Sequence, residues 1–472
     1  ELARVRARRA HRRTRRRGGA VMPQIGLLLV QIAVVVIAAR VVGLLFRRIG
    51  QPQVMGEMVA GILLGPSFLG LVAPTVSARL FPPASLGFLN SISQVGLLVF
   101  MFLVGLELNP RLLRGRGHTA VVTSHASIVV PFVLGALLSL HLYPRLSDSS
   151  VTFTGFALFM GAAMSVTAFP VLARILTERG LTRTRVGTVA IACAAVDDVT
   201  AWCILAVVVA IVRTTGADHG LPPWATIVGS AVYVVAMVMV VRRALAPLER
   251  RYQRDGKLTQ DMLGLVLLVA LASAWATEAL GVHALFGAFL AGAVMPKGEG
   301  FVHALTGKLE DVTVVLLLPL FFAFTGLRTR IGLVEGAEMW GFCALVILVA
   351  VAGKFGGSAV AARLTGMGTR EAAAIGALMN TRGLMELVIL NIGLDIGVIS
   401  PAVFAMMVMM ALVTTFMTSP LLELVYPARL IRSGGGHDVP ADEPADERER
   451  EEEEEPGHPL NRGSRPMLVR GG

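Results

Sequence analysis

Charged residues are scarce in this chain of 472 residues. Lys, Arg, Asp and Glu together make up 16% of the sequence and hydrophobic residues 54%, and the mean hydropathy is +0.69. Soluble domains carry about 25% charged residues, so this composition excludes an ordinary soluble protein. Apolar stretches long enough to cross a bilayer recur from about residue 22 to residue 427, which predicts an all-α polytopic membrane protein.

Cysteine is also rare, and its three positions, Cys193, Cys203 and Cys343, fall inside apolar runs without the spacing of metal ligands. This pattern excludes a disulfide framework and a zinc site. A Gly-rich dinucleotide-binding unit is missing after the last apolar run, so we expect no nucleotide-gated domain and no cofactor. The net charge is +11, but the basic residues sit mainly in short loops, so we expect a lipid bilayer and no nucleic acid as partner.

Hydropathy and turn signals divide the apolar part of the chain into about thirteen segments. We expect membrane helices at about 23–46, 53–71, 85–108, 118–142, 151–177, 184–213, 223–246, 258–279, 281–296, 303–327, 336–363, 369–394 and 400–427. An odd number of spans places the two termini on opposite sides of the membrane.

The basic residues of the loops predict the orientation. The loops on one side carry eighteen Lys and Arg residues, and those on the other side carry five. The positive-inside rule then places the C-terminus in the cytoplasm and the N-terminus outside a cell membrane. Residues 1–21 contradict this tally, because they would put nine arginines outside. We interpret Met22 as the native start and 1–21 as a basic extension; the alternative, a basic cytoplasmic tail, requires an even number of spans.

Residues 22–431 form the predicted transmembrane domain, and the remaining residues, 432–472, are rich in glycine and then acidic. A run of charge without apolar periodicity is typical of a solvated, disordered tail, which we expect in the cytoplasm.

Two pairs of segments contain similar sequence motifs. GEMVAGILLGP (Gly56–Pro66) resembles GAFLAGAVMP (Gly287–Pro296), and FMFLVGLELNPRLLRG (Phe100–Gly115) resembles LFFAFTGLRTRIGLVEG (Leu320–Gly336). Each pair is offset by seven spans, and an odd offset means that the matched helices run in opposite directions. The pattern predicts two inverted-topology repeats, about 23–213 and 258–427, joined by a linker helix at about 223–246, as in secondary transporters.

The same offset pairs the fifth segment with the twelfth. The fifth contains Ser165 and Thr167 just before a proline, and the twelfth contains Asn380 and Thr381 just before a glycine. Because proline lacks an amide donor and glycine tolerates non-helical torsions, both segments are predicted to be discontinuous helices. We expect these four side chains to line a polar cavity near the membrane midplane.

Two adjacent carboxylates, Asp197 and Asp198, lie near the middle of the sixth segment. Ionisable groups inside a membrane are costly and are functional candidates by default. Neighbours on a helix point about 100° apart, so the two carboxylates cannot share one face. Lys354, the only lysine deep inside a segment, is the expected partner of one of them. An ion pair that only fixes helix packing would explain one aspartate but would leave the second without a cation.

Arg382 and Glu386 lie four residues apart on the twelfth segment, close enough to pair on one helix face. We expect this pair to neutralise the broken helix as a structural element. Inverted repeats with broken helices also suit a sodium-coupled symporter of a small organic anion, which stays the alternative function at this point.

Four sequence motifs, in the order in which they occur, resemble those of the monovalent cation:proton antiporter-2 family, and within it the branch of plant and fungal cation/proton exchangers. They are SVTAFPVLARIL, VDDVTAW, PLFFAFTGLRT and NTRGLMELVILNIG, and the resemblance covers about residues 23–427. It implies a thirteen-helix fold with two crossed, unwound helices, an ion-translocation domain and a dimerisation domain, assembled as a homodimer. The implied activity is exchange of Na⁺ or K⁺ for H⁺ by alternating access, which is transport and not enzyme catalysis.

The resemblance also implies roles for single residues. Asp198 would bind the transported cation or the proton, Asp197 would pair with Lys354, and Ser165 and Thr167 would lie in the unwound stretch. The Asp-Asp pair with Lys354 favours Na⁺, whereas the words SVTAFP and DVTAW favour K⁺.

Overall fold

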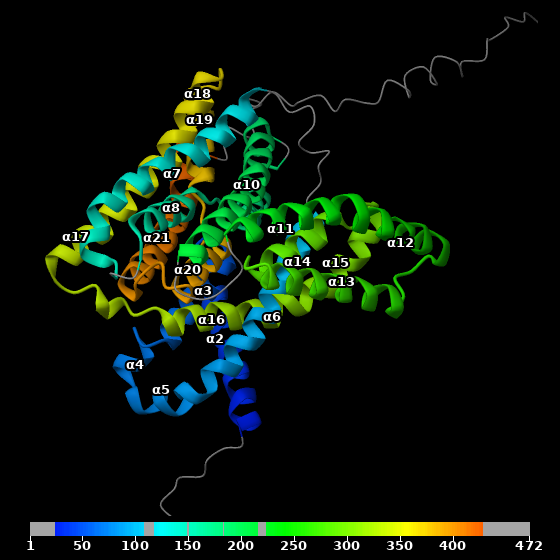
Figure 1. Cartoon of the computed structure of the whole chain (residues 1–472). Helices are drawn as coiled ribbons and strands as arrows, with labels where there is room; N and C mark the ends of the chain where they lie inside the picture. Colours follow the sequence, from blue (N-terminus) through cyan, green and yellow to red (C-terminus); the bar gives the residue numbers. More distant parts are fainter. Residues whose placement is uncertain (1–23, 108–117, 149–150, 183, 216–222, 428–472) are drawn as a thin grey trace, which may run out of the picture.

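The structure is a computed structural model that describes residues 24–107, 118–148, 151–182, 184–215 and 223–427. Every regular element in these ranges is a helix (Figure 1). The predicted basic extension at 1–21 and the predicted acidic tail at 432–472 lie outside the described residues.

The helices follow the predicted segments closely. In chain order they are α2 (Gln24–Arg48), α3 (Gln53–Leu64), α4 (Leu69–Val72), α5 (Pro74–Leu80), α6 (Pro83–Glu107), α7 (His118–Leu146), α8 (Phe153–Ser165), α9 (Phe169–Glu178), α10 (Arg185–Thr215), α11 (Pro223–Ala236), α12 (Arg242–Asp255), α13 (Gln260–Ala279), α14 (Ala284–Val294), α15 (Glu299–Val312), α16 (Leu318–Arg328), α17 (Gly336–Val351), α18 (Gly357–Leu364), α19 (Thr369–Met379), α20 (Leu384–Asp395) and α21 (Pro401–Val425). Three π-helical turns, η2 (Met237–Val241), η3 (Thr313–Leu317) and η5 (Ala352–Gly356), join α11 to α12, α15 to α16 and α17 to α18 without a break.

Within the described ranges, eleven helical stretches are long and apolar enough to cross a membrane, and the bent pair α19 and α20 makes twelve. The segment expected at 281–296 is shorter than a full span, because α14 has only eleven residues. At about 1.5 Å per residue it covers roughly half of the hydrocarbon core. His283 caps its start, where the side chain accepts from the amide of Leu285, and Pro296 follows its end.

The helices that carry the similar motifs pack in reciprocal pairs, each against the counterpart of the other's partner. α3 packs along α16, and α14, the counterpart of α3, packs along α6, the counterpart of α16. Glycine permits both contacts: a Cβ atom at Gly61 of α3 would overlap the backbone carbonyl of Phe322, and one at Gly292 of α14 would overlap that of Phe102. This reciprocal packing is what two inverted repeats related by a pseudo-twofold axis would produce.

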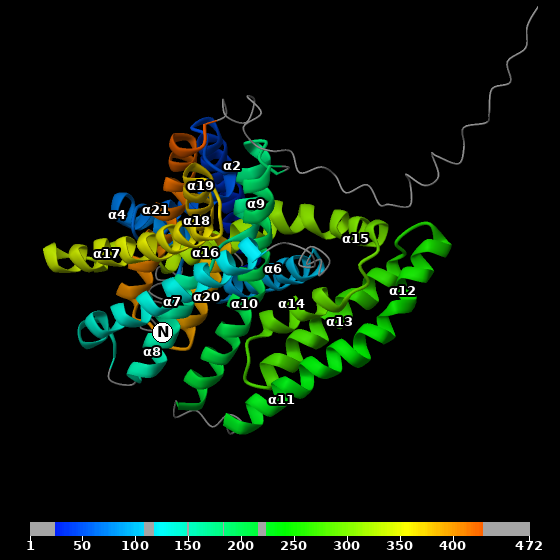
Figure 2. The same cartoon turned by 90° about the horizontal axis from the view of Figure 1, so that it is seen from above.

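Two groups of helices result from this packing, and in Figures 1 and 2 α13 and α15 of one group lie on the flank opposite α7 and α17 of the other. The first helix group contains α2, α3, α6, α13, α14 and the continuous α15–α16. The second helix group contains α7, α8, α10 and α17 to α21. The span formed by α11 and α12 connects the two groups in sequence, at the position predicted for the linker helix.

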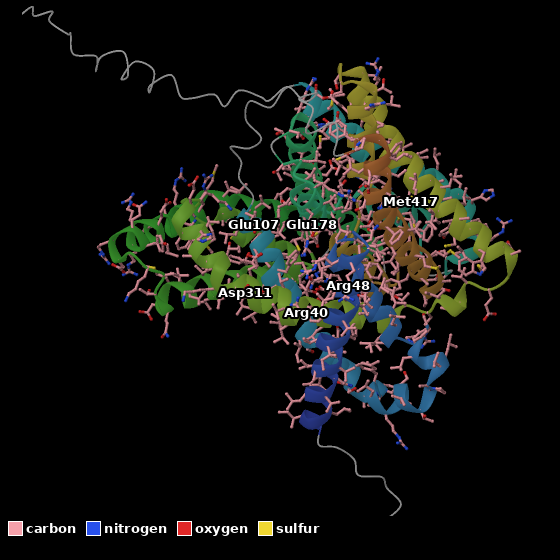
Figure 3. All side chains as sticks on the ribbon, turned by 180° about the vertical axis from the view of Figure 1, so that it is seen from behind. Arg40, Arg48, Glu107, Glu178, Asp311 and Met417 are labelled. Carbon is pink, nitrogen blue, oxygen red and sulfur yellow. The ribbon has the colours of Figure 1, made fainter. Side chains whose placement is uncertain are left out.

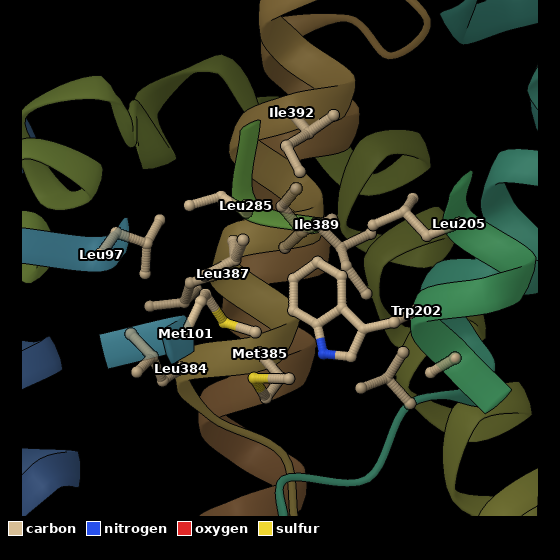
Figure 4. Packing of buried hydrophobic residues seen from close by; sticks show 14 of the residues in the cluster. Leu97, Met101, Trp202, Leu205, Leu285, Leu384, Met385, Leu387, Ile389 and Ile392 are labelled. Carbon is tan, nitrogen blue, oxygen red and sulfur yellow. The ribbon is translucent and has the colours of Figure 1, made fainter. Parts of the chain in front are cut away.

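Buried apolar side chains join the two groups near the middle of the molecule. The ring of Trp202 on α10 lies edge-on to Phe286 and stacked with Phe289 of α14, with centroid distances of 5.2 and 6.4 Å. Figure 4 shows the same indole pointing toward Met385 and Ile389 of α20. Buried apolar side chains therefore pack against α20, the helix that follows the second break.

Candidate functional site

The two predicted discontinuous helices are both interrupted, and their breaks lie against each other. The second pair of half-helices, α19 and α20, is bent by 42°. The backbone N–H of Ala168, between α8 and α9, donates to the carbonyl oxygen of Thr381, between α19 and α20, at 3.0 Å. The two unwound stretches thus use each other's backbone groups, which a membrane interior would otherwise leave unsatisfied.

Proline and glycine explain where the breaks occur. Pro170 is the second residue of α9, a position where its missing amide costs no helical hydrogen bond. Gly383 precedes α20, and a Cβ atom there would lie 2.9 Å from Cγ2 of Val171. A side chain at this glycine would press against Val171 in the first turn of α9.

Asp197 is saturated with hydrogen-bond donors. Its Oδ1 accepts from Ser124 Oγ at 3.0 Å, and its Oδ2 lies 2.6 Å from Ser127 Oγ and 2.9 Å from Thr167 Oγ1. Lys354 Nζ, in η5, lies 2.9 Å from the same Oδ2, and the side chains of this ion pair are fully buried. Lys354 Nζ also lies 2.6 Å from Thr167 Oγ1. Three of these four donors contact Oδ2 and one contacts Oδ1, so the negative charge of Asp197 is already compensated by Lys354 and the hydroxyl groups.

Asp198 has the opposite environment, one residue along α10. It is 3% exposed, and both of its carboxylate oxygens lack a hydrogen-bond partner in the described part of the chain. The backbone amide of Phe169, the first residue of α9, interacts with the carboxylate but does not meet the geometry of a hydrogen bond. A buried carboxylate without partners is unstable as a permanent anion, so this position calls for a proton or a cation.

Arg382 and Glu386 form a buried ion pair with an Nη1–Oε2 distance of 2.8 Å. The guanidinium also donates to the carbonyl oxygens of Ala163 at 3.0 Å and Met164 at 2.6 Å, the last turn of α8. These carbonyls have no partners within their own helix and lie at the negative end of its dipole. Arg382 therefore caps one broken helix while its partner Glu386 sits in the first turn of the other; the structural role of this pair stays a prediction.

The four side chains expected to line a cavity are fully buried and hydrogen bonded instead. Ser165 Oγ donates to the preceding turn of α8, and Asn380 and Thr381 bond to α21. Thr167 joins the Asp197 carboxylate to the backbone of α19. They surround the crossing of the breaks, and none of them lines the cavity that approaches it.

A cavity of about 280 Å³ separates the two helix groups on one side of the crossing. Its polar lining comes from Glu57 on α3, Glu107 on α6, Glu310 on α15 and Arg174 on α9. Its apolar lining includes Leu384, the first residue of α20. Figure 3 shows the side of the molecule on which Glu107 and Glu178 end α6 and α9. The cavity leads from that side toward both breaks and stops short of Asp198.

Sequence reasoning missed the two serines on α7. Ser124 and Ser127 lie three residues apart on one helix face, and both hold Asp197. Serine is common in membrane helices and usually bonds to its own backbone, so only the spacing could have marked them. Glu107, the last residue of α6, also lies on the cavity wall.

Known proteins resemble this chain over most of its length. The model of one protein family, described as "Sodium/hydrogen exchanger, transmembrane", matches residues 34–424. The Na(+)/H(+) antiporter NhaS4 of Synechocystis sp. is 47% identical over 403 residues, which cover 85% of this chain and 98% of that protein. Cation/H(+) antiporter 17 of Arabidopsis thaliana is 41% identical over 400 residues, covering 85% of this chain and 48% of that protein. The chain therefore spans about half the length of the Arabidopsis relative.

The fold is also that of a solved structure, the sodium proton antiporter MjNhaP1 from Methanocaldococcus jannaschii. The two share a TM-score of 0.56 at 15% identity, and the alignment covers 86% of this chain and 98% of the other. Because the family model matches most of the residues and a relative is matched almost from end to end, the chain belongs to the sodium/hydrogen exchanger family.

Proposed function

We propose that this protein exchanges Na⁺ or K⁺ for H⁺ across a membrane, and that Asp198 is the carboxylate that binds either ion. The observation that carries this assignment is the contrast between the two neighbouring aspartates. Asp197 is held by Lys354 and three hydroxyl groups, whereas both oxygens of Asp198 are buried without a hydrogen-bond partner in the described residues.

Exchange follows from competition for one negative charge. A proton on Asp198 neutralises it directly, and a partly dehydrated cation does so with help from nearby oxygen atoms of the unwound stretches. Because the two occupants neutralise the same carboxylate, binding of one displaces the other. A neutralised site can be moved between the two sides of the membrane at lower electrostatic cost than an empty one.

Access from one side follows the cavity between the helix groups. Its three glutamates, Glu57, Glu107 and Glu310, outnumber its one arginine, Arg174, which favours the entry of cations. Alternating access then requires that the two helix groups move so that the crossing of the breaks communicates with the other side. The roles of Asn380, Thr381, Ser165 and Thr167 in this scheme are to hold the unwound backbone in place.

The test is exchange in proteoliposomes that contain the full chain and a pH-sensitive dye. We expect Na⁺ or K⁺ added to wild-type vesicles to dissipate an imposed pH gradient, and Asp198→Asn to abolish this response at normal folding yield. The matched control is Asp261→Asn, which neutralises an exposed carboxylate in the first turn of α13. Normal exchange by Asp198→Asn would refute the assignment, and a screen of both cations decides which of them is transported.

The proposed setting is a cell membrane crossed many times, with the C-terminus in the cytoplasm and the N-terminus outside. The excess of basic residues in the loops on the Glu107 side supports this orientation. The homodimer is proposed from the family resemblance. Light scattering of the purified protein in detergent, with the detergent mass subtracted, distinguishes one copy from two.

A further inference from the structure

A polar network joins the two helix groups on the side opposite the cavity. Arg328, the last residue of α16 in the first group, lies 2.6 Å through Nη2 from Oδ1 of Asp395, the last residue of α20 in the second group. Arg328 Nη1 also donates to Asn391 Oδ1 at 3.1 Å. Asn391 Nδ2 in turn donates to Thr325 Oγ1 at 2.8 Å, which returns the network to α16.

The position of this network relative to the cavity is set by one continuous helix. Glu310, in the cavity wall, and Arg328 lie 18 residues apart along α15 and α16. At about 1.5 Å per residue, the two side chains are separated by about 27 Å along the helix axis. The helix groups are thus held together by ionic and amide contacts at one end of this helix and are parted by a cavity toward the other.

The partners in the network belong to elements that the proposed movement must separate. α20 carries the second break, and its other end lies beside the cavity through Leu384. Asn391 is only 3% exposed, so its bonds to Arg328 and Thr325 are shielded from water and are stronger than surface hydrogen bonds. When the Arg328 side opens, these bonds must break, because they cross the surface along which the groups part.

The open side carries opposite charges that are not joined across the cavity. Arg174 on α9 of the broken helix faces the cavity together with Glu57 and Glu107 of the first group. It forms an ion pair with Glu178 on its own helix, at 3.0 Å, and attracts Glu57 across the cavity without forming an ion pair with it. The closed end therefore has an ion pair between the groups, whereas at the open end Arg174 pairs within its own helix and Glu57 bonds to Gln53 within its own helix.

We infer that Arg328, Asp395 and Asn391 form a latch that stabilises the conformation open on the Glu107 side and that must release before the site opens on the Arg328 side. The inference rests on the proposed exchange function. Arg328 and Asp395 act on the equilibrium between the two conformations, and the cation site at Asp198 is left unchanged.

The latch predicts that weakening it changes the apparent KM for the cation in opposite directions on the two sides of the membrane. Weakening it raises the population of the conformation open on the Arg328 side, so the apparent KM for the cation falls on that side and rises on the Glu107 side. For a partly exposed ion pair with two additional hydrogen bonds, we expect the ratio of the two KM values to change by about three- to tenfold. The change has the same sign for Arg328→Gln and for Asp395→Asn.

That shared sign separates a latch from a local field effect. Removing the positive charge of Arg328 would raise the cation concentration near the Arg328 side, whereas removing the negative charge of Asp395 would lower it. A field effect therefore changes the two KM ratios in opposite directions. The experiment measures exchange in right-side-out and everted vesicles for both single variants and for the charge swap Arg328→Asp with Asp395→Arg. The control is Arg330→Gln, which removes an exposed arginine two residues after the end of α16.

The expected result is an equal direction of change in both single variants, wild-type behaviour in the control, and a ratio restored toward wild type in the charge swap. Unchanged ratios with normal exchange, or changes of opposite sign, would overturn the latch and leave the proposed function intact. Loss of exchange in the wild-type protein itself would instead refute the proposed function. Melting temperatures of all variants show whether any of them fails to fold.

Discussion

Adjacent aspartates in one membrane helix receive different surroundings because they point in different directions. Asp197 faces α7, where Ser124 and Ser127 donate to it, and η5, where Lys354 lies. Asp198 is turned toward the first residue of α9 and has no hydrogen-bond partner among the described residues. The helical offset of about 100° between neighbours therefore assigns one carboxylate to a fixed ion pair and leaves the other for exchangeable ions.

This division of roles predicts unequal effects on stability. Asp197→Asn leaves the buried ammonium of Lys354 without its counter-charge, which should lower the free energy of unfolding by about 3–5 kcal/mol. Adding Lys354→Met removes the unpaired charge, so the double variant should recover most of this loss. Melting temperatures of the purified proteins check both expectations. Asp198→Asn serves as the control, because it breaks no hydrogen bond in the described residues and should melt at or above the wild-type temperature.

Charge in an apolar run identified the centre of the site from the sequence, because carboxylates and ammonium groups in a membrane demand partners. Asp197, Asp198, Lys354, Arg382 and Glu386 are all buried at or beside the crossing of the breaks. Hydroxyl groups carried no such signal, since a serine can bond to its own helix wherever it lies. The same ambiguity explains why Ser165 and its three companions were expected in a cavity and instead satisfy neighbouring backbone and side chains.

The elements at the site are half-helices whose ends are matched to charges. Arg382 lies at the carbonyl end of α8, Glu386 in the first turn of α20, and the amide end of α9 faces Asp198. Each placement puts a charge where the helix dipole favours it. Proline and glycine predicted that the helices break, but only the assembled structure shows that the two breaks bond to each other.

Reciprocal packing of the matched helices extends to their ends. Lys297, after α14, donates to the carbonyl oxygens of Gly105 and Leu106 at the end of α6, at 2.9 and 2.7 Å. Ser67, after α3, donates to the carbonyl oxygen of Thr329 at the end of α16, at 2.6 Å. Similar words in the sequence predicted the matched helices, whereas the crosswise pairing depends on contacts between residues more than 180 positions apart.

The glycines at these crossings should tolerate no side chain. Gly61→Ala and Gly292→Ala each place a Cβ atom into a facing backbone carbonyl, which should lower the free energy of unfolding by about 1–3 kcal/mol. Gly264→Ala on α13 is the matched control, because a Cβ atom there meets nothing within 4 Å and should stabilise the helix by about 0.5–1 kcal/mol. Melting temperature and yield of folded protein measure the difference. If Gly292→Ala has the same melting temperature as Gly264→Ala, the close approach of α6 and α14 is wrong.

At the scale of the whole molecule, two helix groups touch through a polar network at one end and enclose a cavity at the other. Composition and hydropathy predicted the membrane-spanning class and nearly every helix, because burial in lipid requires long apolar segments. They did not predict which end is open, because relative movement of two packed groups leaves no pattern in hydrophobicity. The distribution of basic residues gives a prediction of which end faces the cytoplasm.

Labelling of single cysteines from the two sides of the membrane tests that orientation. Lys257→Cys lies in the loop between α12 and α13, among the basic loops, and Leu333→Cys lies after α16 among the loops that carry few basic residues; both positions are exposed. With the three native cysteines replaced, an impermeant maleimide should label Leu333→Cys in intact cells and Lys257→Cys only after permeabilisation. The reverse pattern would place the acidic cavity outside the cell, so the proposed latch would then stabilise an outward-open protein.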